Sequence, residues 1–116
     1  MAGKVMHFEI HGSDAKRTQE FYAALFDWKV DANNPMNYGL VGAEAPGIGG
    51  GITSSCEAPR VTFYVAVPDL AAALKKAESL GGKTAMEPHL VPGGPEIAMF
   101  ADPDGNHIGL VKDTSV

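Results

Sequence analysis

The chain carries one short pattern twice, and this repeat limits what it can fold into. Residues 7–14 read HFEIHGSD and residues 62–69 read TFYVAVPD, an offset of about half the 116-residue length. Each copy is a strand pattern that ends in an aspartate able to cap a helix, Asp14 in the first and Asp69 in the second. We therefore predict two versions of one supersecondary unit in tandem, with function where the two halves face each other.

Length and composition indicate one globular domain. The chain has 116 residues, of which 45% are hydrophobic and 20% are charged. We predict a single domain over residues 1–116, with module one at about 1–57 and module two at about 58–116. Either module alone would bury too little surface for stability, so the two must share a core within the chain or with a second chain. A homodimer is the expected assembly.

Charge and cysteine content narrow the partners and the compartment. The formal net charge of −5, with no basic run, argues against nucleic acid. Apolar runs are too short to cross a membrane, and the N-terminal residues lack a signal-type segment. Cys56 is the only cysteine, which excludes an internal disulfide and fits a reducing compartment. We expect a soluble, cytoplasmic protein.

The first half predicts a strand, a helix and three further strands. Residues 4–11 alternate, so that an apolar face lies opposite a polar face that carries His7, Glu9 and His11. From Asp14 the period becomes helical until about Asp27. We expect four residues of this helix to cover the apolar face of the strand: Thr18, Phe21, Tyr22 and Leu25. The remaining strands are expected around residues 28–30, 38–41 and 49–52.

The second half repeats this order. A strand at residues 62–67 leads into a helix that Asp69 caps and Gly81-Gly82 ends. Further strands are expected at residues 83–87, 96–101 and 107–112, the last two joined by a tight turn. Residues 88–95, with three prolines and two glycines, are predicted to form a loop that closes over a pocket.

The duplicated unit occurs with Phe21-Tyr22 in the first helix, Leu80-Gly81-Gly82 at the end of the second, and DPDGN at residues 102–106. Together these features resemble the vicinal oxygen chelate superfamily of glyoxalase, bleomycin-resistance and extradiol dioxygenase proteins. The resemblance implies an α+β fold of two tandem βαβββ modules. These would form a curved, mostly antiparallel sheet around a cavity, with the helices outside, often in a dimer.

The resemblance also implies where a divalent metal ion would be held. In metal-dependent relatives the ligands are inward-facing residues of the first and last strand of each unit, and these positions correspond to His7, the vicinity of Gly51, Thr62 and Gly109. Only His7 is a normal ligand, whereas a catalytic site typically has about three from the protein. We therefore predict no bound metal and no cofactor, as in glyoxalase-like members without the full ligand set. We expect Gly109→Glu to restore one oxygen donor.

His7 and Glu9 are the candidate catalytic residues. They lie two positions apart on one strand, hence on one face and about 7 Å apart along it, so both can meet one ligand. In the structural alternative, Glu9 pairs with a neighbour such as Arg60 and His7 bonds to backbone. An unorthodox metal site built from His7, Glu9 and His107 is a further alternative.

Other residues are candidates for binding the ligand. Tyr64 can donate a hydrogen bond to a carbonyl group or form a stacking wall, and His107 shares the face of Gly109. Their structural alternatives are a core tyrosine and a solvated histidine. The remaining candidates for the pocket are Thr62, Trp28, Tyr38, Met99 and Met36.

The leading interpretation is a glyoxalase-like protein that binds a small molecule without a catalytic metal. One alternative is an enzyme, a lyase or isomerase in which Glu9 or His7 moves a proton next to a carbonyl group. Another is drug sequestration of the bleomycin-resistance type, for which the acidic charge suits a cationic ligand.

Overall fold

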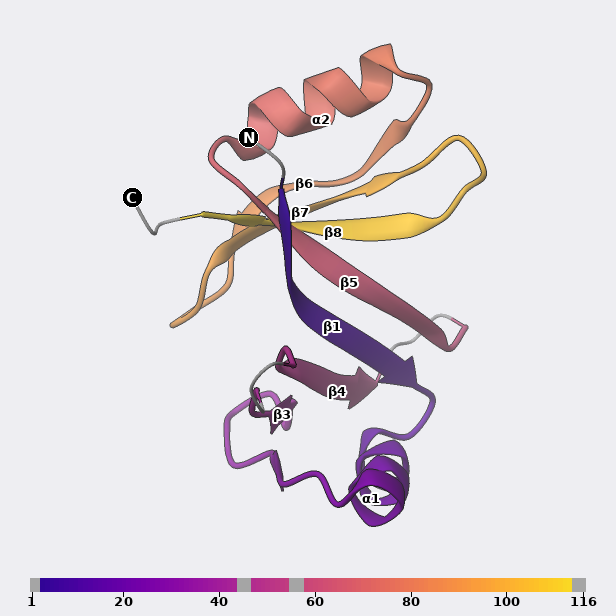
Figure 1. Cartoon of the computed structure of the whole chain (residues 1–116), viewed down its shortest axis with the longest axis vertical. Coiled ribbons are helices and arrows are strands. Elements are labelled where there is room, and N and C mark those ends of the chain that lie inside the picture. The colour runs from indigo at the N-terminus through magenta and orange to yellow at the C-terminus, as the bar shows by residue number, and fades with distance from the viewer. Residues whose placement is uncertain (1–2, 44–46, 55–57, 114–116) are drawn as a thin grey trace. The chain divides into compact units, whose positions relative to one another are not determined.

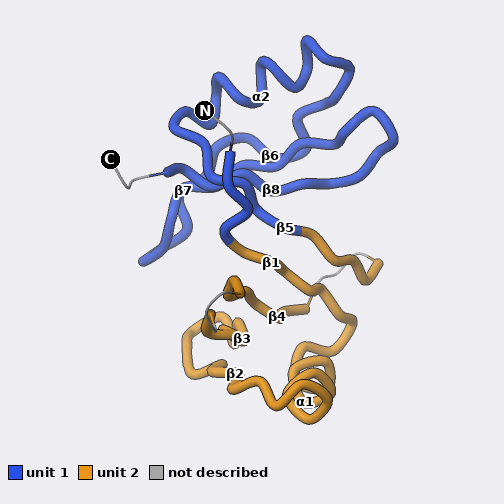
Figure 2. The backbone as a smooth tube through the Cα atoms, in the orientation of Figure 1, with its two compact units in different colours: residues 1–6, 63–116 blue, residues 7–62 orange. Residues whose placement is uncertain are grey.

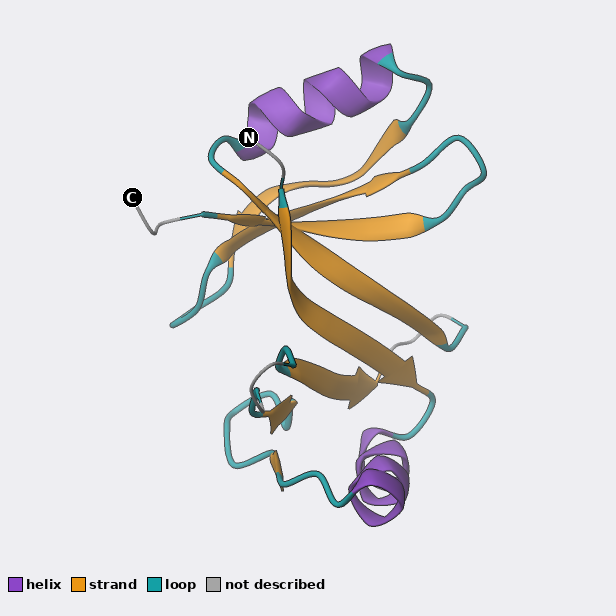
Figure 3. Ribbon diagram, in the orientation of Figure 1, coloured by secondary structure: helices purple, strands orange, loops and turns teal. Residues whose placement is uncertain are grey.

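The computed structural model describes residues 3–43, 47–54 and 58–113, and Cys56 lies outside them (Figure 1). In the described residues each helix is followed by a run of strands that pair mostly antiparallel, which confirms the α+β class (Figure 3). The elements are β1 (Lys4–Gly12), α1 (Ala15–Phe26), β2 (Val30–Asp31), β3 (Gly39–Val41), β4 (Gly50–Ser54), β5 (Arg60–Val67), α2 (Leu70–Ser79), β6 (Lys83–Leu90), β7 (Glu96–Ala101) and β8 (His107–Lys112).

The described chain divides into two compact units (Figure 2). We call residues 7–62 the first unit, and residues 1–6 with 63–116 the second unit. The strand order is β2-β3-β4-β1 in the first unit and β5-β8-β7-β6 in the second. In both, the strand before the helix pairs in parallel with the last strand, and the other pairs are antiparallel. The predicted tandem βαβββ modules are therefore confirmed.

Helix α1 begins and ends where the sequence predicts, but its buried residue is Gln19, which is not among those expected to cover the sheet. The Asp14 carboxylate accepts a hydrogen bond from the Arg17 backbone N–H at 3.2 Å, and Asp27 ends the helix in the left-handed conformation, with φ 58°. The helix packs against β4 with Gln19 buried. Phe21 and Leu25, predicted to cover the sheet, are 58% and 57% exposed. The helical period is therefore predicted correctly, but two of the four residues expected to cover the sheet point outward.

The bulky side chain of α1 that does pack inward belongs to Tyr22. Its ring stacks on Trp28 with centroids 5.9 Å apart. Trp28 in turn contacts Phe8 of β1 at 5.4 Å and Phe26 at 5.0 Å. This aromatic cluster joins α1 to the apolar face of β1, so the predicted contact between helix and strand is made through Tyr22.

Helix α2 follows the sequence prediction closely. Asp69 caps it by accepting a hydrogen bond from the Ala72 N–H at 3.0 Å, and Gly81 follows it with φ 101°. Helix α2 packs against β6, β7 and β8. The core of the second unit consists of Leu70, Leu74, Ala98 and Leu110.

Strand β6 is longer than predicted. Residues 88–90, assigned to a loop from the sequence, continue the strand to Leu90, and the loop is confined to residues 91–95. Pro88 has no N–H to donate, but β6 stands at the end of the strand order, where a proline is tolerated. The pairing with β7 shifts register between Thr84 and Met86 and again between Met86 and His89.

Within the described residues no helix is long and apolar enough to cross a membrane.

Candidate functional site

The hydroxyl of Tyr38 lies between the two predicted catalytic side chains in the first unit. It donates a hydrogen bond to Glu9 Oε2 at 2.7 Å and lies 2.8 Å from His7 Nε2. A phenol has one proton, and here that proton goes to Glu9, so the His7 Nε2–H must be the donor in the second bond. The sequence prediction that His7 and Glu9 share a face of β1 is therefore correct, and Tyr38 joins them.

His11 completes this cluster on the other side of Glu9. Its Nε2 lies 2.6 Å from Glu9 Oε1, so each carboxylate oxygen has a hydrogen-bond partner. Glu9 is only 8% exposed. The Nδ1 atom of His11 is buried and has no hydrogen-bond partner among the residues described. We call His7, Glu9, His11 and Tyr38 the His7 cluster. His11, which the strand alternation places on the same face as His7 and Glu9, is thus part of the cluster.

Burial sets the charge of the imidazole at one end of the cluster. Desolvation lowers the pKa of His7 below its usual value of 6.5, and the negative charge of Glu9 opposes part of that shift. At neutral pH the ring is therefore uncharged. A neutral ring with its proton on Nε2 agrees with the hydrogen bond that His7 makes to the Tyr38 oxygen.

Tyr38 is held in place by an asparagine four residues before it. Asn34 Nδ2 donates to the Tyr38 carbonyl oxygen at 2.7 Å, and Asn34 Oδ1 accepts from the Tyr38 N–H at 2.9 Å. Asn37 adopts a left-handed conformation, with φ 52°, which turns the chain just before Tyr38. The sequence indicates a loop at residues 33–35. It does not indicate that the Asn34 side-chain amide makes both hydrogen bonds to the Tyr38 backbone.

Gly51 provides the space that the Tyr38 ring occupies. Gly51 lies opposite Glu9 in the pairing of β4 with β1. A Cβ atom on Gly51 would overlap the hydroxyl and ring carbons of Tyr38. A glycine at this position, which the family resemblance associates with a metal ligand, is explained by the ring that covers it.

In the second unit a tyrosine ring also covers a glycine, but here the ring belongs to the residue opposite the glycine. Gly109 of β8 lies opposite Tyr64 of β5, and a Cβ atom on Gly109 would overlap the Tyr64 ring. Tyr64 is 7% exposed. Gly109 does not have a positive φ, so its backbone would accept other residues, but the space beside it is filled. A glutamate at residue 109 would therefore have to displace Tyr64 before it could supply an oxygen donor.

The other predicted site residues lie elsewhere. In the first unit Thr62 is buried and Trp28 belongs to the aromatic cluster. In the second unit Met99 is buried in β7 and pairs with Gly109, while His107 is exposed at the start of β8 opposite Ala101. A pocket that these residues share with the His7 cluster stays a prediction. So does a metal site that includes His107.

The residues at the family's metal positions do not fit a metal ion. Gly51 and Gly109 offer no side-chain donor, and aromatic rings cover both. In the described part of the chain there is no group of three or more His, Cys, Asp or Glu side chains that could hold a metal ion. The Tyr38 hydroxyl lies between His7 and Glu9, the two donors closest to such a set.

Solved structures share this fold. A member of the glyoxalase/bleomycin resistance protein/dioxygenase superfamily from Vibrio splendidus 12B01 is 18% identical, with a TM-score of 0.65, over 97% of this chain and 100% of that one. A methylmalonyl-CoA epimerase from Mycobacterium tuberculosis is 16% identical, with a TM-score of 0.67, over 95% and 87%. A hypothetical protein from Bacillus halodurans C-125 is 13% identical, with a TM-score of 0.70, over 100% and 98%.

No match was found among curated proteins. The family model of the glyoxalase-like domain matches residues 7–111, which is most of the chain. The fold is thus shared with that member of the glyoxalase/bleomycin resistance protein/dioxygenase superfamily. The chain belongs to the glyoxalase-like domain family.

Proposed function

We propose that the chain binds a small carbonyl compound at the His7 cluster. The observation that carries this proposal is the Tyr38 hydroxyl, set between His7 Nε2 and Glu9 Oε2 at 2.8 and 2.7 Å. Hydrogen-bond donors held in place in a partly buried site suit an oxygen acceptor of a ligand. The neutral His7 ring adds an N–H donor without a second charge.

The ligand oxygen is expected to take the hydrogen bond that Tyr38 now gives to Glu9. The Glu9 carboxylate would then face the carbon next to the carbonyl group, while its other oxygen stays bonded to His11. The cluster therefore favours a carbonyl group with an adjacent C–H bond over a plain carboxylate, which Glu9 would repel.

The experiment is a thermal-shift screen against 2-oxoaldehydes, thiol adducts, catechols and cationic antibiotics, followed by titration calorimetry of the ligands that bind. Tyr38→Phe keeps the ring and removes the hydroxyl, and it should weaken a carbonyl ligand at least about tenfold. Tyr22→Phe is the matched control, because Tyr22 packs in the aromatic cluster. Unchanged carbonyl affinity in Tyr38→Phe would overturn the proposal. Stabilisation by cationic antibiotics alone would favour drug sequestration instead.

A second candidate function is proton transfer at that adjacent carbon, as in a lyase or isomerase. The observation that favours it is the burial of Glu9 between His11 and Tyr38, which each hydrogen-bond one carboxylate oxygen. These bonds hold the carboxylate in one orientation, as a general base requires. Glu9 would take the proton from carbon, the C–H electron pair would form the enolate, and Tyr38 and His7 would hydrogen-bond the enolate oxygen. Return of the proton to carbon closes the cycle.

Deuterium exchange tests this second function. The enzyme should exchange the ligand's C–H for deuterium in D2O, as followed by NMR, and Glu9→Gln should reduce the rate by at least about a hundredfold. Glu87→Gln, an exposed carboxylate of β6, is the control. Binding without exchange would show that the protein binds the ligand but does not catalyse proton transfer at that carbon.

The assembly and compartment form part of the proposal. We propose a cytoplasmic homodimer, supported by the single cysteine of the chain and by three apolar side chains of α1 that are more than half exposed: Phe21, Leu25 and Phe26. A second copy of the chain is the expected partner for this face, since each module alone has a small core.

A further inference from the structure

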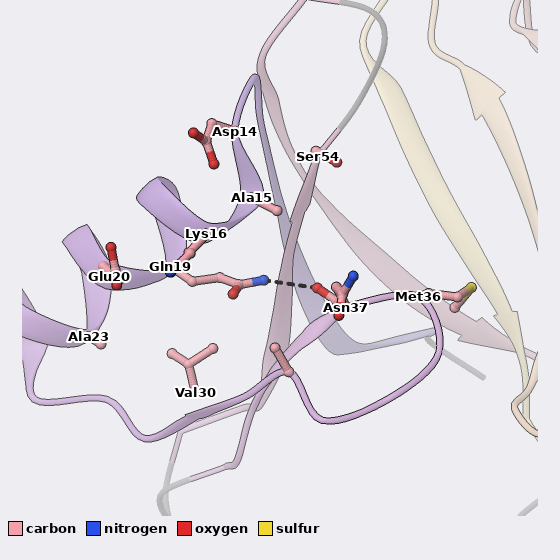
Figure 4. A pocket seen from close by; sticks show the side chains of 11 residues that line it. Asp14, Ala15, Lys16, Gln19, Glu20, Ala23, Val30, Met36, Asn37 and Ser54 are labelled. Atoms are coloured by element: carbon pink, nitrogen blue, oxygen red, sulfur yellow. Dashed lines mark hydrogen bonds between the residues drawn. The ribbon is translucent and has the colours of Figure 1, made fainter.

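A cavity lies in the first unit between α1 and the segment that follows β2 (Figure 4). Its volume is about 710 Å³, which is in the range of pockets that hold small organic molecules. We call it the α1 pocket. None of the four residues of the His7 cluster lines it.

The sequence of α1 explains why the space is open. Ala15, Gln19 and Ala23 are spaced four apart, so they share one face of the helix, and all three line the α1 pocket. The two alanine methyl groups do not fill the distance to Val30 on the opposite wall, as Figure 4 shows. The large apolar residues of the helix, Phe21 and Leu25, are exposed instead.

Gln19 gives the pocket a fixed polar atom. Its Nε2 donates to the Ile52 carbonyl oxygen at 2.8 Å and to the Asn37 carbonyl oxygen at 3.1 Å, which uses both amide protons. Gln19 is 9% exposed, and within the described residues its Oε1 accepts no hydrogen bond. An acceptor held in this way, in a largely buried side chain, gains from a ligand that donates a hydrogen bond.

The charged side chains around the pocket favour a cation. Asp14 and Glu20 contribute two negative charges to the lining and Lys16 contributes one positive charge (Figure 4). The walls between them are apolar or small, and Met36, itself 63% exposed, closes one side. A ligand that fits both features carries N–H donors with a positive charge and a short apolar body.

We propose that the α1 pocket binds a small organic cation, of the class of protonated primary amines, with its ammonium group on Gln19 Oε1. This site is separate from the His7 cluster and goes beyond the carbonyl binding proposed above. The ammonium donates to the amide oxygen and is attracted by Asp14 and Glu20, while the alkyl part lies between Ala23 and Val30.

The test uses n-butylamine at pH 7.5, with n-butanol and butyrate as neutral and anionic probes of similar size. Two-dimensional amide NMR of the whole chain should show saturable shifts of the Gln19 side-chain amide with butylamine at millimolar concentration, and much weaker shifts with the other two probes. Ala23→Leu, which fills the pocket, should weaken butylamine at least about tenfold. Ala24→Leu, on the exposed side of α1, is the matched control.

A second variant keeps the test decisive should Ala23→Leu disturb the fold. Lys16→Gln removes the one positive charge of the lining and should tighten butylamine about two- to threefold, with a loss of affinity at high salt. Equal affinity for butyrate, weaker binding by Lys16→Gln, or no saturation up to about 20 mM would overturn the proposal. The resonances of His7 and Tyr38 report on the carbonyl site separately, so the two proposals can fail independently.

Discussion

The ring of Tyr38 covers Gly51, and the hydroxyl of that ring bonds to Glu9, the residue opposite Gly51 in the neighbouring strand. The absence of a side chain at residue 51 is thus a condition for the His7 cluster to form. The local geometry, rather than a special backbone conformation, requires the glycine, since its φ is not positive.

Gly51→Ala should therefore destabilise the protein by about 1–3 kcal/mol, because the new methyl group must push aside a packed aromatic ring. Urea unfolding measures the loss. Gly42→Ala is the matched control, because a Cβ atom there meets nothing within 4 Å. Equal stability of the two variants would show that Tyr38 does not lie against Gly51.

The second unit allows a coupled test of the same geometry. Gly109→Ala and Tyr64→Ala should each destabilise, the first through overlap with the Tyr64 ring and the second through loss of a buried ring. The double variant should lose less than the two single losses together, by at least about 0.5 kcal/mol, because removing the ring removes the overlap. Additive losses in chemical denaturation would contradict this. Gly109→Glu alone should destabilise without creating a zinc site.

Stability should depend on pH through His7. Its pKa is lowered by burial in the folded state, so between that pKa and the unfolded value of about 6.5 the unfolded chain binds more protons than the folded chain. The stability that the neutral His7 ring contributes is fully present above about pH 6.5. It is lost as the pH falls below that value toward the lowered pKa of the folded state. His7→Gln should flatten this part of the curve of unfolding free energy against pH from 5 to 8.

His89→Gln, on the exposed part of β6, is the control for the pH experiment. It should leave the slope between pH 5 and 7 as in the unmodified protein. An unchanged slope in His7→Gln would mean that the imidazole of His7 is not held in its neutral form by burial.

Metal content follows from the donor set. We expect fewer than about one divalent ion per four chains after dialysis, because Gly51 and Gly109 supply no donors. Elemental analysis of the purified protein, together with native mass spectrometry, measures this directly. Zinc, nickel or iron at one ion per chain that resists dialysis would contradict the expectation.

The exposed face of α1 predicts the oligomeric state. Light scattering should give a homodimer at micromolar concentration, and Leu25→Lys should shift it toward monomer by placing a charge in an apolar contact. Leu80→Lys is the control, because Leu80 is a comparably exposed leucine at the end of α2. A monomer in the unmodified protein would contradict the proposed dimer.

Local signals made the elements predictable from sequence. Asp14 and Asp69 each cap a helix through their own side chains, and Gly81 ends α2 with a positive φ. The inward face of α1 depends on partners far along the chain, since Gln19 is buried by bonds to the carbonyl groups of Asn37 and Ile52. Periodicity favours Phe21 and Leu25 because they are apolar, and it carries no information on those carbonyl groups.

The candidate site divides in the same way. That His7, Glu9 and His11 share a face follows from the alternation of a single strand. The position of Tyr38 depends on its two hydrogen bonds to the Asn34 side chain and on the space left by Gly51. The sequence of the strand that carries the histidines contains no information on either. Tyr38 could be chosen as a candidate from its residue type, but its role as the link between His7 and Glu9 could not.

Strand β6 has a consequence for behaviour at high concentration. An outermost strand offers unpaired backbone groups to which a strand of another molecule can add, and long regular edges of this kind promote fibrils. Pro88 removes one N–H from β6, and the two register shifts beside it bend the strand out of a regular ladder. The segment around Pro88, which was assigned to a loop from the sequence, thus reduces the tendency of this edge to pair with other molecules. Pro88→Val is expected to make the protein more prone to form fibrils.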